Sequence, residues 1–486
     1  MSARNVVLIV LDTVRKDVYD EYAPRLRTAA DASFEQCRAA SSWSAPSHAS
    51  VLTGELPHQH GVHAESFGSD FSFSRFARDD LFLGRLPEHA TIGLSANPYV
   101  NSAFDFDVLF DEFHDFSIGS QSNPALFTDG LTVQEYVERS DASNAVGRYL
   151  GFLRACLGHD APAKSLANGA WSRVGPAATR LPIPELVDDG ARNIANAAVE
   201  AVDAIDEPCF VFANFMDAHT PLRNLWQYDQ SLHSVPNGWS STELSKWELN
   251  AEGAATEEYT RNYRQLYAAA VDYLDRVVSD LVGRLRRVAD RETTVVVISD
   301  HGHNLGYPAD DGLFHHTRSM TEGVLHTPCD VINPPAGYPS TETRYFSQLA
   351  LGDLLVRLAR GEPFDEGLVA DRIPAELVGV LGGERSVWSQ PDADAEFWNR
   401  MIRCVYDGEG TRKFQWDSLG ASEEYELDPD RPSWQRRVAT DVEIPAAARG
   451  LFDVELSEYK ARAAAAPREM DFDATLEERL DELGYL

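Results

Sequence analysis

The stretch NVVLIVLD, from Asn5 to Asp12, decides the fold class of this chain. An unbroken apolar run rich in β-branched residues is typical of a strand that is buried on both faces of a parallel sheet. Similar runs recur at ATIGLSA from Ala90, CFVFANF from Cys209 and TTVVVIS from Thr293. Helical patterns lie between these runs, and the clearest of them spans residues 263–288. Strands that alternate with long helices predict a doubly wound, mostly parallel α/β sheet that is flanked by helices.

The pattern changes along the chain and predicts two domains. We expect the α/β domain to span residues 1–370 and to carry a helical insertion over one of its faces at 117–186, where strand signals are missing. Residues 371–486 are expected to form a small antiparallel sheet followed by a terminal helix. The runs that predict this second part are RSVWSQ, NRMIRCVYD, TRKFQW and EEYELD for the strands, and ATLEERLDELGYL for the helix.

Acidic residues far outnumber basic ones, which indicates the conditions and partners that suit this protein. Asp and Glu number 77 against 43 Lys and Arg, the formal net charge is −34, and only five of the basic residues are lysine. Such a surface stays soluble in concentrated salt, where its self-repulsion is screened. We therefore expect a halophilic source. We do not expect a nucleic-acid partner, because phosphate backbones are bound by basic surfaces.

Cysteine spacing and hydropathy favour a cytoplasmic protein. The five cysteines are scattered and show no paired spacing, so neither a disulfide framework nor a zinc site is indicated. No stretch approaches the ~18 apolar residues of a membrane helix, and the first strand begins without a signal-type segment. The oligomeric state is left open.

Polar residues cluster where the predicted strands end, which is where ligands gather in such sheets. Taken singly, each has an ordinary explanation as a turn residue or a helix cap. Found together at several strand ends of one α/β chain, they predict an active site. They are Asp12 after the first strand, Ser44 just before Pro46 at a helix start, Asp217 and His219 after the third strand, and Asp300, His301 and His303 after the fourth.

Several of these segments resemble the motifs of one family. SAPSHASVLTG is similar to the nucleophile signature of the sulfatase branch of the alkaline phosphatase superfamily. VVLIVLDTVRKD and VVVISDHGHNLG resemble its two metal motifs, and NFMDAHTP resembles its His-any-Pro motif. The resemblance covers nearly the whole chain and identifies it as a sulfatase-like hydrolase, here of a haloarchaeal type.

The resemblance implies roles for individual residues. Asp12, Asp300, His301 and the Ser44 oxygen would hold one divalent cation, and Ser44 would be the nucleophile. Such an oxygen-rich set suits calcium, magnesium, manganese or zinc, with calcium the family's expectation. The helix that is expected to begin at Pro46 adds N–H groups, and His219 is the expected general acid.

The departures from the family pattern concern positive charge. His48 replaces an arginine that the formylglycine-generating enzymes read, and Thr13 replaces a second aspartate. Asn97 stands near the place of one anion-binding lysine, and His316 and Arg318 stand near the place of another. We expect Asn97, His316 and Arg318 to bind the substrate, and we count His48 among the catalytic residues with Ser44 and His219. Imidazoles supply charge there only when protonated.

Three hypotheses follow. The first is a metal-dependent hydrolase in which unmodified Ser44 attacks a small-molecule or glycan ester of sulfate or phosphate. The second is a sulfatase in which Ser44 is converted to formylglycine. The third is a non-catalytic binding protein that keeps the fold. We favour the first, because all four proposed metal ligands and His219 are present.

Overall fold

The computed structural model describes residues 3–117, 130–138, 140, 145–178, 183–316, 318–380, 395–408 and 410–466. Its centre is an eight-stranded sheet of order β10-β2-β9-β6-β1-β5-β3-β4, in which only β9 runs antiparallel to its neighbours. The strands are β1 (Asn5–Leu11), β2 (Ala32–Arg38), β3 (Ala90–Ser95), β4 (Glu112–Asp115), β5 (Cys209–Phe215), β6 (Thr293–Ile298), β9 (Cys329–Ile332) and β10 (Thr341–Ser347). The predicted fold class is confirmed.

The strand β1 is the axis of this sheet. It pairs in parallel with β5 on one side and with β6 on the other, so that Val6 lies opposite both Phe210 and Thr294. All of its residues are buried. This burial on both faces is the reason for the uninterrupted apolar run in its sequence.

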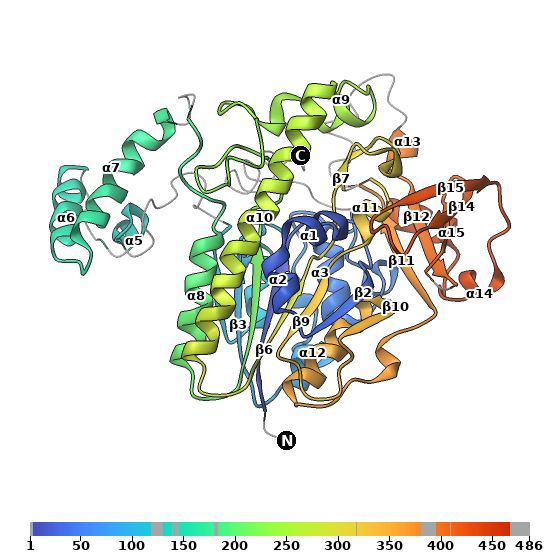
Figure 1. Cartoon of the computed structure of the whole chain (residues 1–486), viewed down its shortest axis with the longest axis horizontal. Coiled ribbons are helices and arrows are strands. Elements are labelled where there is room, and N and C mark those ends of the chain that lie inside the picture. Colours follow the sequence, from blue (N-terminus) through green and yellow to red (C-terminus); the bar gives the residue numbers. More distant parts are fainter. Residues whose placement is uncertain are drawn as a thin grey trace.

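Helices flank the sheet in two groups (Figure 1). The helices of one group pack against one another; they are α1 (Lys16–Tyr22), α2 (Pro24–Ala29), α8 (Ala191–Ala204) and α10 (Glu257–Val288). The other group comprises α3 (Ser44–Thr53) and α12 (Leu351–Ala359). The helix α10 begins six residues before the predicted range, because Thr256 caps it by accepting a hydrogen bond from the Tyr259 N–H at 3.1 Å.

A second, antiparallel sheet lies beside the first (Figure 1). Its strands are β11 (Arg372–Val378), β12 (Met401–Asp407), β13 (Arg412–Asp417), β14 (Ser422–Leu427) and β15 (Gln435–Thr440). The short helices α14 (Ala446–Arg449) and α15 (Leu456–Ala464) follow it. The predicted strand at 385–390 and the predicted terminal helix at 474–486 lie outside the described residues, and the domain boundary at 370 stays a prediction.

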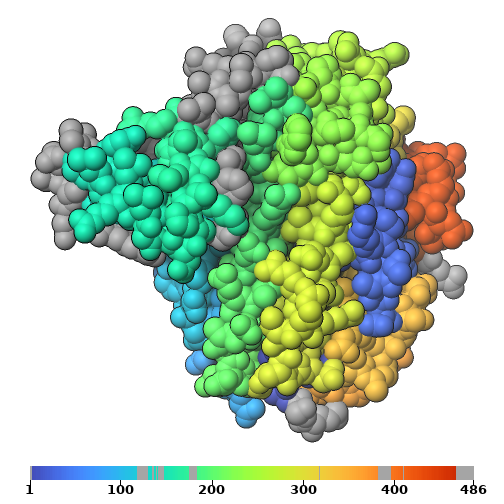
Figure 2. All heavy atoms as spheres, turned by 60° about the vertical axis from the view of Figure 1, so that its left-hand side comes forward, coloured from blue at the N-terminus to red at the C-terminus, as the bar shows by residue number. Residues whose placement is uncertain are grey.

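Three helices within residues 117–186 form a separate group: α5 (Val133–Glu138), α6 (Ala145–Leu157) and α7 (Pro162–Ala178). They pack around a small core of Leu131, Phe152 and Cys156. In both whole-molecule views they project from the side of the α/β body (Figures 1 and 2). Across the described part of the chain, no helix has the length and apolarity that crossing a membrane requires.

Candidate active site

Four predicted residues meet at the carboxyl edge of the large sheet. One ligand atom from each of Asp12, Asp300 and His301 lies within 4.8 Å of the other two. The Ser44 Oγ is 3.4 Å from the Asp12 Oδ2 and 3.4 Å from the His301 Nε2. All four side chains are buried.

The sheet explains why these residues meet. Because β1 and β6 are adjacent and parallel, Asp12 and Asp300 both follow strands that end at the same edge. Ser44 reaches that edge as the first residue of α3, whereas the sequence predicted a helix that begins at Pro46. Trp43 occupies the cap position, so Ser44 is not an ordinary helix cap.

The backbone at Thr13 is held in an uncommon conformation beside the carboxylates. Its φ is 61°, a value that β-branched residues rarely adopt and that costs about 1–3 kcal/mol. The Thr13 N–H donates to the Asp300 Oδ1 at 3.4 Å. Tyr267 holds this turn in place, since its hydroxyl donates to the Thr13 carbonyl at 2.5 Å and accepts from the Arg15 N–H at 3.0 Å. Sequence reasoning missed Tyr267, which lies in the middle of α10.

The two carboxylates form a site of concentrated negative charge. Burial, followed by repulsion from Asp300, raises the pKa of Asp12 well above its usual value. Burial raises the pKa of Asp300 to about 7. The Asp12 Oδ1 and the Asp300 Oδ2 have no hydrogen-bond partner within the described structure. Two buried carboxylates with orphaned oxygens fit a bound divalent cation, which would replace the missing partners.

His301 is oriented as a metal-binding imidazole would be. Its Nδ1 donates to the Gly302 carbonyl at 2.9 Å, which leaves the Nε2 lone pair directed toward Ser44 and Asp300. Asn97 fixes the other carboxylate, because its Nδ2 donates to the Asp12 Oδ2 at 2.6 Å. The structure therefore places Asn97 against a proposed metal ligand.

His48 carries no positive charge in this environment. Its Nδ1 donates to the Ser44 carbonyl at 2.8 Å, and its Nε2 lies 3.4 Å from the Asn214 amide nitrogen. Burial lowers the pKa of His48 to about 4. The imidazole is therefore neutral near pH 7 and does not replace the charge of the arginine that the family has at this position.

His219 and His316 face each other, with ring centroids 5.4 Å apart. The His219 Nδ1 donates to the Thr220 carbonyl at 2.6 Å and the His316 Nδ1 donates to the Ser42 carbonyl at 2.9 Å. The two Nε2 atoms are 3.3 Å apart. Since both Nδ1 atoms already carry hydrogen, a bond between the Nε2 atoms requires one further proton. The His316 ring also stacks on His301, with ring centroids 4.3 Å apart.

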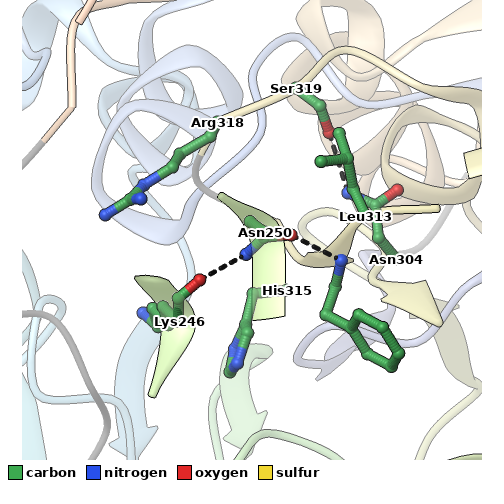
Figure 3. A pocket seen from close by; sticks show the side chains of 8 residues that line it. Lys246, Asn250, Asn304, Leu313, His315, Arg318 and Ser319 are labelled. Carbon is green, nitrogen blue, oxygen red and sulfur yellow. Dashed lines mark hydrogen bonds between the residues drawn. The ribbon is translucent and has the colours of Figure 1, made fainter. Parts of the chain in front are cut away.

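Positive charge reaches this edge from elements that sequence reasoning did not connect. Lys246 is the first residue of α9 (Lys246–Asn250), and Arg318 follows β8 (Phe314–His315). Together with His315 they line a small pocket (Figure 3). Lys246 gave no motif-level signal. Its rarity, as one of five lysines in the chain, was the only available hint.

Comparison with known proteins agrees with this arrangement. The family model described as Sulfatase matches residues 4–360. None of the curated proteins with which the sequence was compared matches it.

Solved structures share the fold at low sequence identity. A 2-O GAG sulfatase is 13% identical with a TM-score of 0.58, and the match covers 97% of this chain and 95% of that one. The phosphonate monoester hydrolase SpPMH from Silicibacter pomeroyi is 16% identical with a TM-score of 0.56, over 87% and 89% of the two chains. The phosphonate monoester hydrolase of Agrobacterium radiobacter is 15% identical with the same TM-score of 0.56, over 88% and 90%.

The family match spans most of the chain and includes the large sheet, in which Asp12 and Asp300 follow strands β1 and β6. The chain belongs to the sulfatase family and is an ester hydrolase.

Proposed function

We propose that the protein hydrolyses sulfate or phosphate esters of small molecules or glycans, with unmodified Ser44 as the nucleophile. The observation that supports this most directly is the position of the Ser44 Oγ, 3.4 Å from both the Asp12 Oδ2 and the His301 Nε2. A hydroxyl in contact with two potential metal ligands has the surroundings that an activated nucleophile requires.

Asp12, Asp300 and His301 would hold one divalent cation, and the Ser44 oxygen would complete the set. Such a cation lowers the pKa of a nearby hydroxyl and offsets charge that grows on a transferred sulfuryl or phosphoryl group. The chain's own contribution is to fix the ligands. Asn97 orients Asp12, and the Thr13 N–H orients Asp300.

His219 and His316 would handle the proton of the leaving group. One added proton would form a hydrogen bond between their two Nε2 atoms. Burial, followed by the charge of His301, lowers the pKa of His316 well below its usual value. In this proposal His219 holds that proton and passes it to the leaving oxygen as the ester bond breaks.

The alternative in which Ser44 is converted to formylglycine requires recognition of a segment with His48 at the arginine position. Because His48 is buried and neutral, it offers the modifying enzyme no arginine-like charge in the folded protein. The mass of the peptide that contains Ser44 distinguishes a plain serine from the aldehyde.

The test is the variant Ser44→Ala, assayed on 4-nitrophenyl sulfate and 4-nitrophenyl phosphate with calcium, magnesium, manganese and zinc in turn. Loss of a nucleophile should lower kcat by roughly 10³-fold or more. Loss of a helix cap would cost only ~1 kcal/mol of stability. Cation binding to the wild type, followed by calorimetry, gives a second readout that does not depend on turnover.

Ser47→Ala is the matched control, because Ser47 is a buried serine of the same helix whose hydroxyl donates to the Ser41 carbonyl. It should keep its turnover. If Ser44→Ala retains wild-type turnover in the best cation, the nucleophile assignment fails. If the wild type binds no divalent cation and hydrolyses neither ester, the proposed metal site and the proposed substrate class are both wrong.

A further inference from the structure

A small pocket adjoins the proposed active site and is built from two distant segments of the chain. One segment is α9, which contributes Lys246 and Asn250. The other is residues 304–319, which contribute Asn304, Arg318 and Ser319 (Figure 3). Asn250 joins the segments, since its Oδ1 accepts from the Phe314 N–H at 2.8 Å.

Two basic side chains lie on the same side of this pocket in Figure 3, Lys246 and Arg318. The Arg318 guanidinium is buried and lies over the Trp398 ring, 5.8 Å from its centroid. Burial, followed by repulsion from Arg318, lowers the pKa of Lys246 to about 7, and burial lowers that of Arg318 to about 10. The charge of Arg318 therefore disfavours the charged form of Lys246, and a bound anion would stabilise both side chains in their charged forms.

The opposite side of the pocket supplies hydrogen-bonding groups. The Ser319 Oγ accepts a hydrogen bond from the Asn304 Nδ2 at 2.8 Å, which fixes the position of the oxygen. The hydroxyl can therefore donate its own hydrogen to a ligand. A guanidinium fork, an ammonium and a hydroxyl match the several oxygens of a sulfate, phosphate or carboxylate group.

The pocket and the proposed reaction site are lined by adjacent residues of the chain. His315 lines it, and the adjacent His316 stacks on His301 and faces His219. A ligand held at Ser44 therefore has a second cationic pocket close to it.

We propose that Lys246 and Arg318 bind a second anionic group of the substrate, so that the protein prefers esters with two anionic groups to esters with one. This inference rests on the proposed function, in which the first anionic group is the ester at Ser44. The pocket then determines specificity and the Ser44 centre carries out the reaction. The second group is an oxyanion, either another ester of the same acid or a carboxylate.

The experiment compares the monoester with the three bis-esters of benzenediol (1,2-, 1,3- and 1,4-), as sulfates and as phosphates, together with 3-carboxyphenyl sulfate. We expect wild type to hydrolyse at least one doubly anionic ester with kcat/KM about 10-fold or more above that of the monoester. Lys246→Gln and Arg318→Gln should reduce this preference by about 10-fold, mainly through KM, because a charge-assisted contact is lost. Lys246→Arg should retain most of it.

Arg85→Gln is the matched control, because it removes one charge next to β3 at the amino edge of the sheet, where Arg85 pairs with Asp353 at 2.6 Å. This variant should keep the wild-type kcat/KM on both the monoester and the bis-ester. Equal losses on monoester and bis-ester in the two pocket variants would overturn the proposal and place these cations at the reacting group. Absence of any wild-type preference would also overturn it. Should Arg318→Gln fail to fold, Lys246→Gln and Lys246→Arg decide the matter.

A binding measurement separates this inference from the proposed function. Calorimetry of the cation-loaded Ser44→Ala variant with bis-ester and monoester needs no turnover. Suppose that the wild type hydrolyses no ester, that Ser44→Ala still binds the bis-ester more tightly than the monoester, and that Ser44→Ala/Lys246→Gln does not. This result would support the pocket assignment and contradict the assignment of Ser44 as the nucleophile. If both esters bind equally, the pocket assignment fails whatever the turnover.

Discussion

At the scale of single residues, the hydroxyl of Tyr267 holds the turn that presents both carboxylates. It contacts the Thr13 carbonyl and the Arg15 N–H, and Thr13 in turn contacts Asp300. Tyr267→Phe should leave two buried backbone groups without partners, at a cost of about 1–3 kcal/mol. It should also weaken cation binding measurably, because the turn at Thr13 is then free to relax. Calorimetric titration with manganese and a thermal melt measure the two effects.

Tyr259→Phe is the control for that variant. Tyr259 lies on the same helix and its hydroxyl donates to the Ser241 carbonyl at 2.6 Å, away from the carboxylates. It should lose stability but keep the wild-type affinity for manganese. If Tyr267→Phe keeps that affinity as well, the turn does not depend on the hydroxyl.

At the scale of elements, His58 joins the short helix α4 (Pro57–His60) to the smaller sheet and to the loop that follows it. Its Nδ1 lies 3.0 Å from the Glu376 Oε1 of β11, and its Nε2 lies 2.7 Å from the Asp453 Oδ1. Burial lowers the pKa of His58, but the contacts with Glu376 and Asp453 outweigh it, so the net pKa is raised above 6.5.

Because the folded pKa of His58 exceeds the unfolded one, its stabilisation is complete below pH ~6.5 and is lost as the pH rises through the folded pKa. The unfolding free energy of the wild type should therefore fall over that pH range, and that of His58→Gln should not show this fall. Urea midpoints at several pH values measure this. His89→Gln is the control, since burial lowers the pKa of His89. Parallel profiles for wild type and His58→Gln would contradict the expectation.

The sequence predicted those elements whose signal is local. Asp12 and Asp300 follow long apolar runs, so their strands and their common edge were foreseeable. The start of α3 was placed two residues too late, because proline is tolerated anywhere in a first turn whose N–H groups lack helical partners. The edge strand β4 has the sequence EFHD, in which exposed and half-buried residues alternate, and it carries no apolar run. Lys246 reaches the pocket through the Asn250–Phe314 contact, which no spacing in the sequence reveals.

At the scale of the whole molecule, the surface is almost free of lysine. Lys16 and Lys413 are buried, Lys246 and Lys460 are half-buried, and Lys164 is exposed. The net charge of −34 is therefore spread over a surface of carboxylates and arginines. The Debye length falls from about 10 Å at 0.1 M salt to about 3 Å at 1 M, so this self-repulsion is strongest in dilute buffer.

The melting temperature should rise by several degrees or more between 0.1 M and 3 M potassium chloride, because salt screens the self-repulsion. Each kcal/mol of stability shifts the melting temperature of a protein of this size by about 1 °C. Sucrose at matched osmolality is the control, since it favours burial without screening charge. Differential scanning calorimetry measures both series. A melting temperature that rises equally in sucrose and in potassium chloride would argue against a salt-adapted surface.

The central place of β1 has a consequence for how the chain is made. Its two neighbours in the sheet lie about 200 and about 290 residues further along the chain. At synthesis rates of 5–20 residues per second, an apolar strand would wait roughly 15–60 s for its second partner. During that time it offers unpaired backbone groups to other nascent chains. Newly made copies should therefore depend on holding chaperones, and no fragment that stops before β6 can assemble the pair of carboxylates.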